Sequence, residues 1–346
     1  MRYSNVYIES FGYELPPNVV TSDDLEKRLG PFYKTLHFQK GQLEALTGIY
    51  ERRYWDPGYR MFEGAIQAGQ KALKNSRISP DDIGMIIYGG VCRDNLEPAT
   101  ACAVAHSLNL GPETQIYDVT NACLGVLNGM VQVANAIELG QIRAGLIVSC
   151  ESSREIMDST INRLLETPNM DTFKQAVATL TGGSGAAAVL MCDASLTESG
   201  HQLLGGVARN ASRFHELCLW GPNTGIPSTI EHVMRTDSVG VLQNGVVLGT
   251  ETFKAFKQEM ALSDDKPDKV ICHQVGATHQ KTILNTIGIP MEKDFATFPF
   301  LGNIGTVSLP ITAALADERE FLLPGDLVGF LGIGSGLNCI ILAIRW

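Results

Sequence analysis

The sequence predicts an α/β fold in which strands and helices alternate as layers around a partly parallel sheet. Short apolar runs bounded by glycine or polar residues alternate with amphipathic segments of helical length. The 346 residues are 45% hydrophobic and 18% charged and include 35 glycines, a composition typical of an apolar-cored globule rather than a disordered or fibrous chain. The spacing of these segments also repeats between the two halves of the chain, which indicates a duplicated unit.

The predicted strands are short runs of aliphatic and β-branched residues, and the predicted helices are longer segments with apolar residues at helical spacing. The strands are expected at residues 85–91, 115–119, 146–150, 186–192, 269–273, 327–331 and 338–344. The helices are expected at residues 62–73, 124–139, 278–286 and 307–315. Strands and helices therefore follow one another along most of the chain, as in a layered α/β protein.

The internal repeat is visible in the distances between comparable positions. From Gly89 to Cys123 there are 34 residues, and from His273 to Thr306 there are 33. Cys123 lies 24 residues before Ile147 in the next predicted strand, and Thr306 lies 24 residues before Phe330 in the strand that follows it. Two stretches have no counterpart by this spacing, residues 93–106 and 195–263. Such unmatched stretches are where we expect specificity to be determined.

Charge and targeting features predict a cytoplasmic protein that does not bind nucleic acid. The chain has 27 Lys and Arg against 37 Asp and Glu, a formal net charge of -10, which disfavours a nucleic-acid partner. Its eight cysteines include no CxxC pair, which is typical of reduced thiols. The first ten residues lack the features of a signal peptide, and the longest uncharged runs are interrupted by polar residues, so no membrane span is predicted.

A cysteine-centred segment is the main chemical candidate. The sequence has no HExxH motif, no P-loop and no GxSxG, which removes support for metal, nucleotide and serine-hydrolase sites. Cys123 follows the predicted strand 115–119 and is expected to open the predicted helix 124–139. The positive end of a helix lowers the pKa of a thiol, so thiolate would form near neutrality. Taken alone, Cys123 could equally be a small buried hydrophobic residue.

Three further segments could complete a nucleophilic site. His273 follows the apolar run 270–272 at a strand end and is the candidate proton partner of a thiol, although alone it could be a satisfied core histidine. Asn303, in the glycine-rich loop 300–306, could donate its amide to an oxyanion or simply cap the next helix. The glycine-rich turn 332–338 could present backbone N–H groups to a carbonyl oxygen or form a plain hairpin turn.

Together these segments resemble the thiolase superfamily over essentially the whole chain. The motifs that carry the resemblance are NACLG at 121–125, CHQV at 272–275, GNIGT at 302–306 and the turn 332–338. The segments TGI at 47–49 and LTGGSGAA at 180–187 are similar to ketoacyl-ACP synthase III, and CRDNLEPAT at 92–100 is most similar to the OleA-type acyl-CoA condensing enzymes of bacterial olefin biosynthesis. The resemblance implies a thiolase fold, a pseudo-duplicated αβαβα layered architecture. Its N-terminal half, residues 1–195, carries the cysteine, and its C-terminal half, residues 196–346, carries the histidine and asparagine.

The resemblance implies an acyltransferase that performs a Claisen condensation through an acyl-cysteine intermediate. Cys123 is then the nucleophile, and His273 and Asn303 hold the enolate oxygen of the second thioester. Glu97 is implied to enter the partner subunit's site in a homodimer and to act as the base; alone, it could be a solvated or helix-N-terminal carboxylate. The implied reaction joins two fatty acyl-CoA substrates head to head, without decarboxylation, to a β-keto acid. It needs no metal or redox cofactor.

The resemblance also implies an oxyanion hole and a substrate tunnel. Backbone N–H groups of Cys123 and of the turn Gly334, Ser335 and Gly336 are expected to hold the oxyanion. A pantetheine tunnel would lead to Cys123, beside apolar channels for the acyl tails. Three residues are candidates for the tunnel mouth, or else ordinary surface cations and a packing indole: Arg52, Arg53 and Trp55.

Two other functions stay open at this point. The first is a decarboxylative 3-oxoacyl-ACP synthase III, which would condense acyl-CoA with a malonyl group on acyl carrier protein and would not need the carboxylate of Glu97. The second is a non-catalytic acyl-CoA binding protein on a thiolase scaffold. The presence of Cys123, His273 and Asn303 together disfavours the second alternative.

Overall fold

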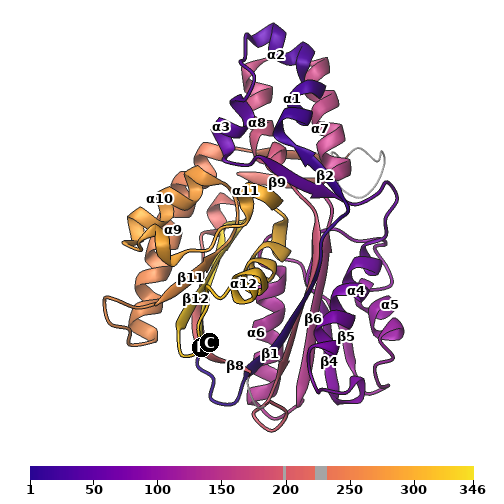
Figure 1. Cartoon of the computed structure of the whole chain (residues 1–346), viewed down its shortest axis with the longest axis vertical. Helices are drawn as coiled ribbons and strands as arrows, with labels where there is room; N and C mark the ends of the chain where they lie inside the picture. The colour runs from indigo at the N-terminus through magenta and orange to yellow at the C-terminus, as the bar shows by residue number, and fades with distance from the viewer. Residues whose placement is uncertain (198–199, 223–231) are drawn as a thin grey trace.

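The computed structural model describes residues 1–197, 200–222 and 232–346. Its centre is a mixed nine-stranded sheet with the strand order β11-β12-β13-β8-β1-β7-β6-β4-β5. The two parts of this sheet, which meet where β8 pairs with β1, enclose α6 and α12 and share one apolar core with them (Figure 1). The outer faces are covered by α4 and α5 on one side and by α9 and α10 on the other (Figure 1). The predicted αβαβα layering is confirmed.

The bounds of the elements are as follows. The large sheet contains β1 (Tyr7–Glu14), β4 (Ile83–Tyr88), β5 (Gln115–Asp118), β6 (Ala144–Glu151), β7 (Gly185–Cys192), β8 (His201–Asn210), β11 (Lys269–Cys272), β12 (Leu327–Gly334) and β13 (Asn338–Arg345). Two separate pairs are β2 (Asn18–Thr21) with β3 (Glu51–Tyr54), and β9 (Cys218–Pro222) with β10 (His232–Thr236). The α-helices are α1 (Ser22–Arg28), α2 (Gly30–Leu36), α3 (Gln42–Thr47), α4 (Met61–Lys74), α5 (Thr100–Ser107), α6 (Gly125–Glu138), α7 (Arg154–Glu166), α8 (Met170–Leu180), α9 (Ser238–Glu259), α10 (Ala277–Ile287), α11 (Phe298–Leu301) and α12 (Ser308–Glu318).

The two halves of the sheet repeat the same pairing directions. In the first half, β1 pairs antiparallel with β7, β7 antiparallel with β6, and β6 parallel with β4, which is parallel to β5. The second half repeats these directions, since β8 pairs antiparallel with β13, β13 antiparallel with β12, and β12 parallel with β11. A single parallel bridge between Val270 and Asp294 stands where the first half has β5. The duplication predicted from spacing is therefore present in the topology.

The prediction that residues 195–263 lack a counterpart is wrong for part of that stretch. Strand β8 occupies the position of β1, and α9 packs on β8 and β13 as α4 packs on β1 and β7. Spacing could not reveal this match, because residues 15–60 separate β1 from α4 whereas a shorter, different segment separates β8 from α9. The antiparallel β9–β10 hairpin lies between β8 and α9, as the antiparallel β2–β3 pair lies between β1 and α4 in the first half.

A helical lobe without a sequence prediction stands at one end of the molecule. It consists of α1, α2 and α3 together with α7 and α8 (Figure 1). These helices enclose their own small apolar core, which includes Leu25, Phe32, Leu43, Met157 and Phe173. The lobe matters for function because α7 and α8 also pack on β10 and contribute to the wall of the cavity described below.

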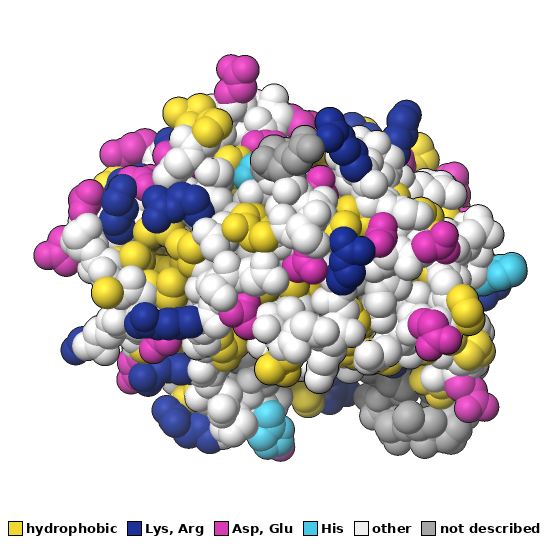
Figure 2. Space-filling model, turned by 90° about the horizontal axis from the view of Figure 1, so that it is seen from below, with side chains coloured by type: hydrophobic (Ala, Val, Ile, Leu, Met, Phe, Trp, Pro, Cys, Tyr) yellow, Lys and Arg dark blue, Asp and Glu magenta, His cyan; other side chains and the backbone are white. Residues whose placement is uncertain are grey.

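All eleven predicted strands and helices are present, with bounds shifted by at most a few residues. Within the described residues, no helix combines the length and apolar character that crossing a membrane requires. On the face seen from below, Lys and Arg side chains stand among Asp and Glu side chains (Figure 2).

The start of α6 is pressed against the end of β4. A Cβ atom added to Gly125, the first residue of α6, would lie 2.7 Å from the carbonyl oxygen of Gly89. Because the obstacle is backbone, a side-chain rotation could not relieve it. The Val126 N–H in the first turn of α6 donates to Thr306 Oγ1 of the second half over 2.8 Å. Both halves therefore fix the helix start that Cys123 precedes.

We expect Gly125→Ala to destabilise the protein by roughly 1–3 kcal/mol, because the new methyl group would force two backbone segments apart. The measurement is the urea midpoint of unfolding. Gly30→Ala is the matched control, because a Cβ at Gly30 would meet nothing within 4 Å. Equal midpoints for the two variants would contradict the close approach.

Candidate active site

A cavity of about 350 Å³ lies beside Cys123. Its lining includes Asn303 from the loop before α12 and Ser335 from the turn after β12, so both halves of the chain contribute. Apolar lining residues come from α7, α8 and the β9–β10 hairpin: Ile156, Ala178, Leu219, Trp220 and Met234. Three of the predicted site elements thus meet at one cavity with a wall suited to an alkyl chain.

Cys123 stands in a strained turn directly before α6. Ala122 has a φ of 46°, a left-handed conformation that is uncommon for a residue with a side chain. The Leu124 N–H donates to the Asn121 carbonyl over 2.9 Å, which closes the turn. The helix itself begins at Gly125, so Cys123 precedes it by two residues and does not open it as predicted.

The glycine-rich turn after β12 lies against the backbone of Cys123. A Cβ atom on Gly334 would be 3.4 Å from the Cys123 nitrogen. The amide of Asn338 donates to Asn121 Oδ1 over 3.2 Å and to the Ser335 carbonyl over 3.3 Å, so the turn is tied to the loop of the nucleophile. The turn also contains Gly336, which has a φ of 103° that disfavours any other residue. The role of these N–H groups as an oxyanion hole stays a prediction.

Asn303 is held by its backbone and by its side-chain oxygen. Its N–H donates to the Thr181 carbonyl over 2.9 Å, and its own carbonyl accepts the Gly183 N–H over 2.9 Å. Its Oδ1 accepts the Gly305 N–H over 3.1 Å. This bond occupies the acceptor of the amide and leaves its NH₂ group as the donor that a substrate oxygen requires. The side chain of Asn303 therefore closes its own loop and lines the cavity. It does not cap α12, which has no side-chain cap, and its donation to an oxyanion stays a prediction.

His273 follows β11, next to the strand that leads into the glycine-rich turn. Its backbone N–H donates to the Leu331 carbonyl over 2.9 Å. The residues that line the 350 Å³ cavity do not include His273, so the predicted partnership with Cys123 is not visible as a shared wall. Burial, with a smaller contribution from His279, lowers the pKa of His273 to about 4. At neutral pH the imidazole is therefore uncharged and able to accept a proton.

The predicted lowering of the Cys123 pKa is wrong. Burial raises the pKa of this thiol to about 12, and Cys218 and Glu151 add to the rise. The positive helix end does not compensate, because the thiolate would lose its water and face a second thiol and a carboxylate. The resting protein therefore holds a neutral thiol and a neutral imidazole, and the thiol must lose its proton during attack.

We expect alkylation of Cys123 by iodoacetamide to accelerate about tenfold per pH unit between about pH 7 and 10, without levelling off, because the thiolate is the reactive form. The rate is followed by mass spectrometry of the Cys123 peptide. Free cysteine is the reference, and its rate should level off above its own pKa of about 8.5. A flat rate for Cys123 across neutral pH would instead indicate a preformed thiolate–imidazolium pair.

Glu97 is exposed and does not line the cavity of its own chain. It lies between β4 and α5, next to Leu96, whose side chain is 78% exposed. The single chain therefore does not bring Glu97 together with Cys123. A role in catalysis requires that a second molecule receive it.

The prediction that Arg52, Arg53 and Trp55 form the tunnel mouth is not supported by their positions. Arg52 is fully buried, and its guanidinium donates to Ser22 Oγ over 3.0 Å. Trp55 is also buried, and its Nε1 donates to the Glu151 carbonyl over 3.1 Å. Arg53 lies in β3, and none of the three lines the cavity. Two cations and an indole close in sequence suggested a surface patch, but alternate residues of a strand face opposite sides.

Glu151 is a site residue that sequence reasoning missed. It ends β6, lines the cavity and is buried, and burial raises its pKa. Its carboxylate accepts the Val91 N–H over 2.9 Å and the Cys92 N–H over 3.2 Å. The available signal was an acidic residue directly after the apolar run 144–150, at the carboxyl end of a strand.

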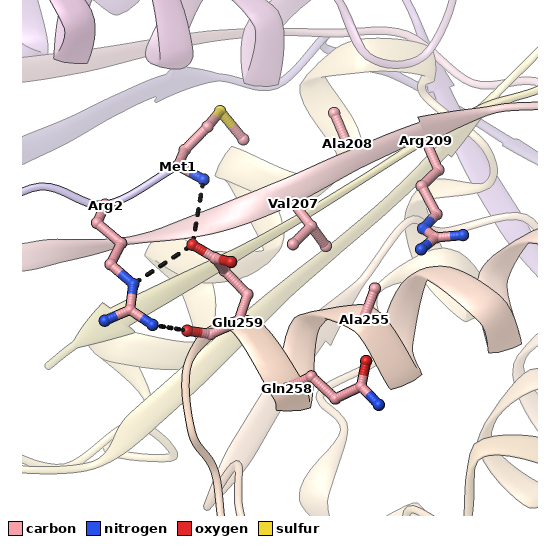
Figure 3. Close-up of a pocket in the computed structure, with 8 residues that line it drawn as sticks. All are labelled: Met1, Arg2, Val207, Ala208, Arg209, Ala255, Gln258 and Glu259. Atoms are coloured by element: carbon pink, nitrogen blue, oxygen red, sulfur yellow. Dashed lines mark hydrogen bonds and ion pairs between the residues drawn. The ribbon is translucent and has the colours of Figure 1, made fainter.

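A second hollow, between β8 and α9, contains none of the predicted site residues (Figure 3). Glu259 forms ion pairs there with Arg2 Nε at 3.3 Å and with the Met1 amino group at 3.7 Å. Arg209 lies apart from this group (Figure 3). This hollow, of about 640 Å³, carries charges but no nucleophile, so the chemistry belongs to the cavity beside Cys123.

Similarity to known families agrees with this geometry. The model of the thiolase N-terminal domain matches residues 63–168, and that of the C-terminal domain of 3-oxoacyl-[acyl-carrier-protein] synthase III matches residues 258–346. In this duplicated fold, a thiol precedes α6 and an amide side chain precedes the equivalent helix α12. Together with the two matched domains, this arrangement defines an acyltransferase with the thiolase fold.

The chain belongs to the OleA family of acyl-CoA:acyl-CoA alkyltransferases. The acyl-CoA:acyl-CoA alkyltransferase of Shewanella oneidensis is 51% identical over the full length of both chains. A structure of an OleA variant from Xanthomonas campestris with bound lauric acid and lauroyl-CoA has a TM-score of 0.92 at 33% identity, covering 99% of this chain and 100% of the other. The β-ketoacyl-[acyl-carrier-protein] synthase III of Natranaerobius thermophilus is 26% identical, over 99% of this chain and 100% of its own. The protein is thus an enzyme, and the non-catalytic alternative is set aside.

Proposed function

We propose that this protein condenses two fatty acyl-CoA molecules head to head to a β-keto acid. The observation that carries the proposal is the 51% identity, over the whole chain, to an acyl-CoA:acyl-CoA alkyltransferase. The cavity supports it, since Cys123 and Asn303 share a space whose wall includes apolar side chains from α7, α8 and the β9–β10 hairpin. We take acyl-CoA as the substrate of both half-reactions.

In the first half-reaction, Cys123 attacks the carbonyl carbon of one acyl-CoA. The thiol proton passes to the neutral imidazole of His273, which then returns a proton to the departing CoA thiolate. The oxyanion of the tetrahedral intermediate is held by the N–H groups of Cys123 and of the turn Gly334–Gly336. A thioester on Cys123 and one free CoA result.

In the second half-reaction, Glu97 removes an α-proton from the second acyl-CoA. The enolate oxygen is held by the Asn303 amide and by His273, and the enolate carbon attacks the thioester on Cys123. The carbon–carbon bond forms and the Cys123 thiolate leaves and regains a proton. Hydrolysis of the remaining CoA thioester by water yields the β-keto acid and a second CoA.

We place Glu97 in the active site of a second copy of this chain. Strand β5 is the last strand of the sheet, and Ile116 on it is 39% exposed. The exposed Leu96 and Glu97 precede α5, whose first N–H groups bond to Asp118 at the end of β5. An edge strand with exposed apolar neighbours is suited to pairing with another chain. The exposed edge strand β5 and the exposed residues Leu96 and Glu97 beside it both favour a homodimer in which each copy donates Glu97.

Three further expectations belong to this proposal. The reaction uses a thiol, an imidazole, an amide and a carboxylate, and we propose that it needs no metal or redox cofactor. The eight cysteines are free thiols, which supports the cytoplasm as the site of the reaction.

We also propose that the two halves of the chain divide between residues 195 and 196, in the segment between β7 and β8.

The second candidate is the decarboxylative condensation of acyl-CoA with a malonyl group on acyl carrier protein. The match of residues 258–346 to 3-oxoacyl-[acyl-carrier-protein] synthase III favours it. Loss of carbon dioxide would create the enolate directly, so Glu97 would not be needed.

The test incubates the purified protein with lauroyl-CoA alone and, separately, with malonyl-ACP added. Free CoA is followed with a thiol reagent, and products are identified by mass. Condensed β-keto acid, or the ketone formed by its decarboxylation, is expected from lauroyl-CoA alone. A product that appears only with malonyl-ACP would overturn the proposal in favour of the decarboxylative reaction.

A further inference from the structure

The segment that carries Glu97 is fastened at both ends. We call residues 89–99, between β4 and α5, the Glu97 loop. At its start, the buried carboxylate of Glu151 accepts the N–H groups of Val91 and Cys92 over 2.9 and 3.2 Å. The Tyr88 hydroxyl donates to the Cys92 carbonyl over 2.6 Å. The first residues of the loop are therefore fixed to β6 and β4.

Asp94 fastens the middle of the Glu97 loop to α4. Its side chain is only 8% exposed, although it lies in a surface loop. It accepts the N–H groups of Met61 and Phe62, in the first turn of α4, over 2.9 Å each, and the Nε of Arg60 over 3.0 Å. Asp94 thus caps a helix that belongs to another part of the chain.

Asp118 fastens the end of the Glu97 loop. Its two carboxylate oxygens accept the N–H groups of Thr100 and Ala101 over 2.9 and 3.0 Å, at the start of α5. Between Asp94 and Thr100, the side chains of residues 95–98 are exposed. Residues 95–98 therefore form a short exposed segment of the loop, held between the carboxylates of Asp94 and Asp118, and Glu97 lies within it.

We propose that Asp94 and Asp118 are positioning residues, which fix the Glu97 loop so that Glu97 is already oriented when it enters the second site. The inference rests on the proposed function of Glu97 as the base of the condensation. A base must come within hydrogen-bonding distance of the proton it removes. A displacement of about 1 Å at such a group can cost about 100-fold in rate.

The experiment compares Asp94→Asn and Asp118→Asn with the wild-type protein. An asparagine presents an NH₂ group where one backbone N–H needs an acceptor, so each variant loosens one anchor without changing side-chain size. Neither residue lines the cavity with Cys123. We expect head-to-head condensation of lauroyl-CoA to slow by about 10- to 100-fold, while the burst of CoA released on acylation of Cys123 keeps its rate and amplitude.

Hydrogen–deuterium exchange gives a readout apart from activity. The peptide that covers residues 89–99 should exchange faster in Asp94→Asn than in the wild type. Asp24→Asn is the matched control, because Asp24 caps α1 in the helical lobe through the Thr21 N–H and hydroxyl. It should leave exchange in the Glu97 loop and both reaction steps unchanged.

Two results would overturn the positioning role of Asp94 and Asp118 without contradicting the proposed function. One is unchanged condensation in both Asp94→Asn and Asp118→Asn while Glu97→Gln abolishes it. The other is an equal loss of acylation and condensation, which would indicate a general structural defect. If Glu97→Gln itself leaves condensation intact, the proposed function fails, and the inference falls with it. The parallel Glu97→Gln assay therefore separates the two failures.

Discussion

Glu97→Gln is expected to stop the reaction after its first half. The amide cannot accept the α-proton of the second acyl-CoA, so the rate of β-keto product formation should fall by about 10²- to 10⁴-fold. Acylation of Cys123 does not use this carboxylate and should proceed. The variant should therefore release one CoA per active site and accumulate the acyl adduct on Cys123, which intact-protein mass spectrometry detects.

Glu113→Gln is the matched control for this prediction. Glu113 is an exposed glutamate in the neighbouring segment between α5 and β5, and the same substitution there should leave both steps at the wild-type rate. Continued formation of β-keto product by Glu97→Gln would show that another group removes the proton. In that case the homodimer would have no catalytic reason to bring Glu97 to the second site.

Cys123→Ser is expected to abolish both half-reactions. A serine hydroxyl is a much weaker nucleophile than the Cys123 thiol, which gives up its proton during attack. The rate of acylation should therefore fall by at least about 10³-fold. No acyl adduct and no CoA burst should appear with lauroyl-CoA. The cavity should keep its shape, so binding of acyl-CoA, measured by calorimetry, should remain.

Cys218→Ser tests the specificity of that result. Cys218 is the other cysteine that lines the cavity among the described residues, and its thiol lies 3.4 Å from the Thr236 hydroxyl. Its replacement should preserve the acyl adduct and the CoA burst. An adduct that persists in Cys123→Ser and disappears in Cys218→Ser would show that Cys218, and not Cys123, is the nucleophile.

Strands and helices with uninterrupted apolar character could be predicted from the sequence. Strand β6 is buried along its whole length, and the apolar run that forms it is evident. Strand β1 was missed because buried residues alternate with half-buried ones, including Glu9, along it. Helix α9 was missed because it lies in residues 195–263, which the spacing does not match to the first half.

The meeting of Cys123 and Asn303 at one cavity could be predicted because each lies between a strand and a helix in a duplicated unit. Their electrostatics could not. The pKa of Cys123 depends on burial and on the charges of Cys218 and Glu151, which are far away in the sequence. Likewise, the burial of Arg52 depends on its contacts with Ser22 and the Leu180 carbonyl. Local sequence indicates which groups are present, whereas the tertiary packing determines their charge.

The central position of β1 also has a consequence for biosynthesis. Its neighbour β7 begins at residue 185, 178 residues after β1 begins at residue 7, and β8 follows at residue 201. At a synthesis rate of about 5–20 residues per second, β1 emerges from the ribosome roughly 10–35 s before β7. Throughout that interval it has neither of its sheet partners. Pairing of β1 must therefore await the middle of the chain, and completion of the sheet must await β13 at residues 338–345. This long-range pairing is expected to make spontaneous refolding slow.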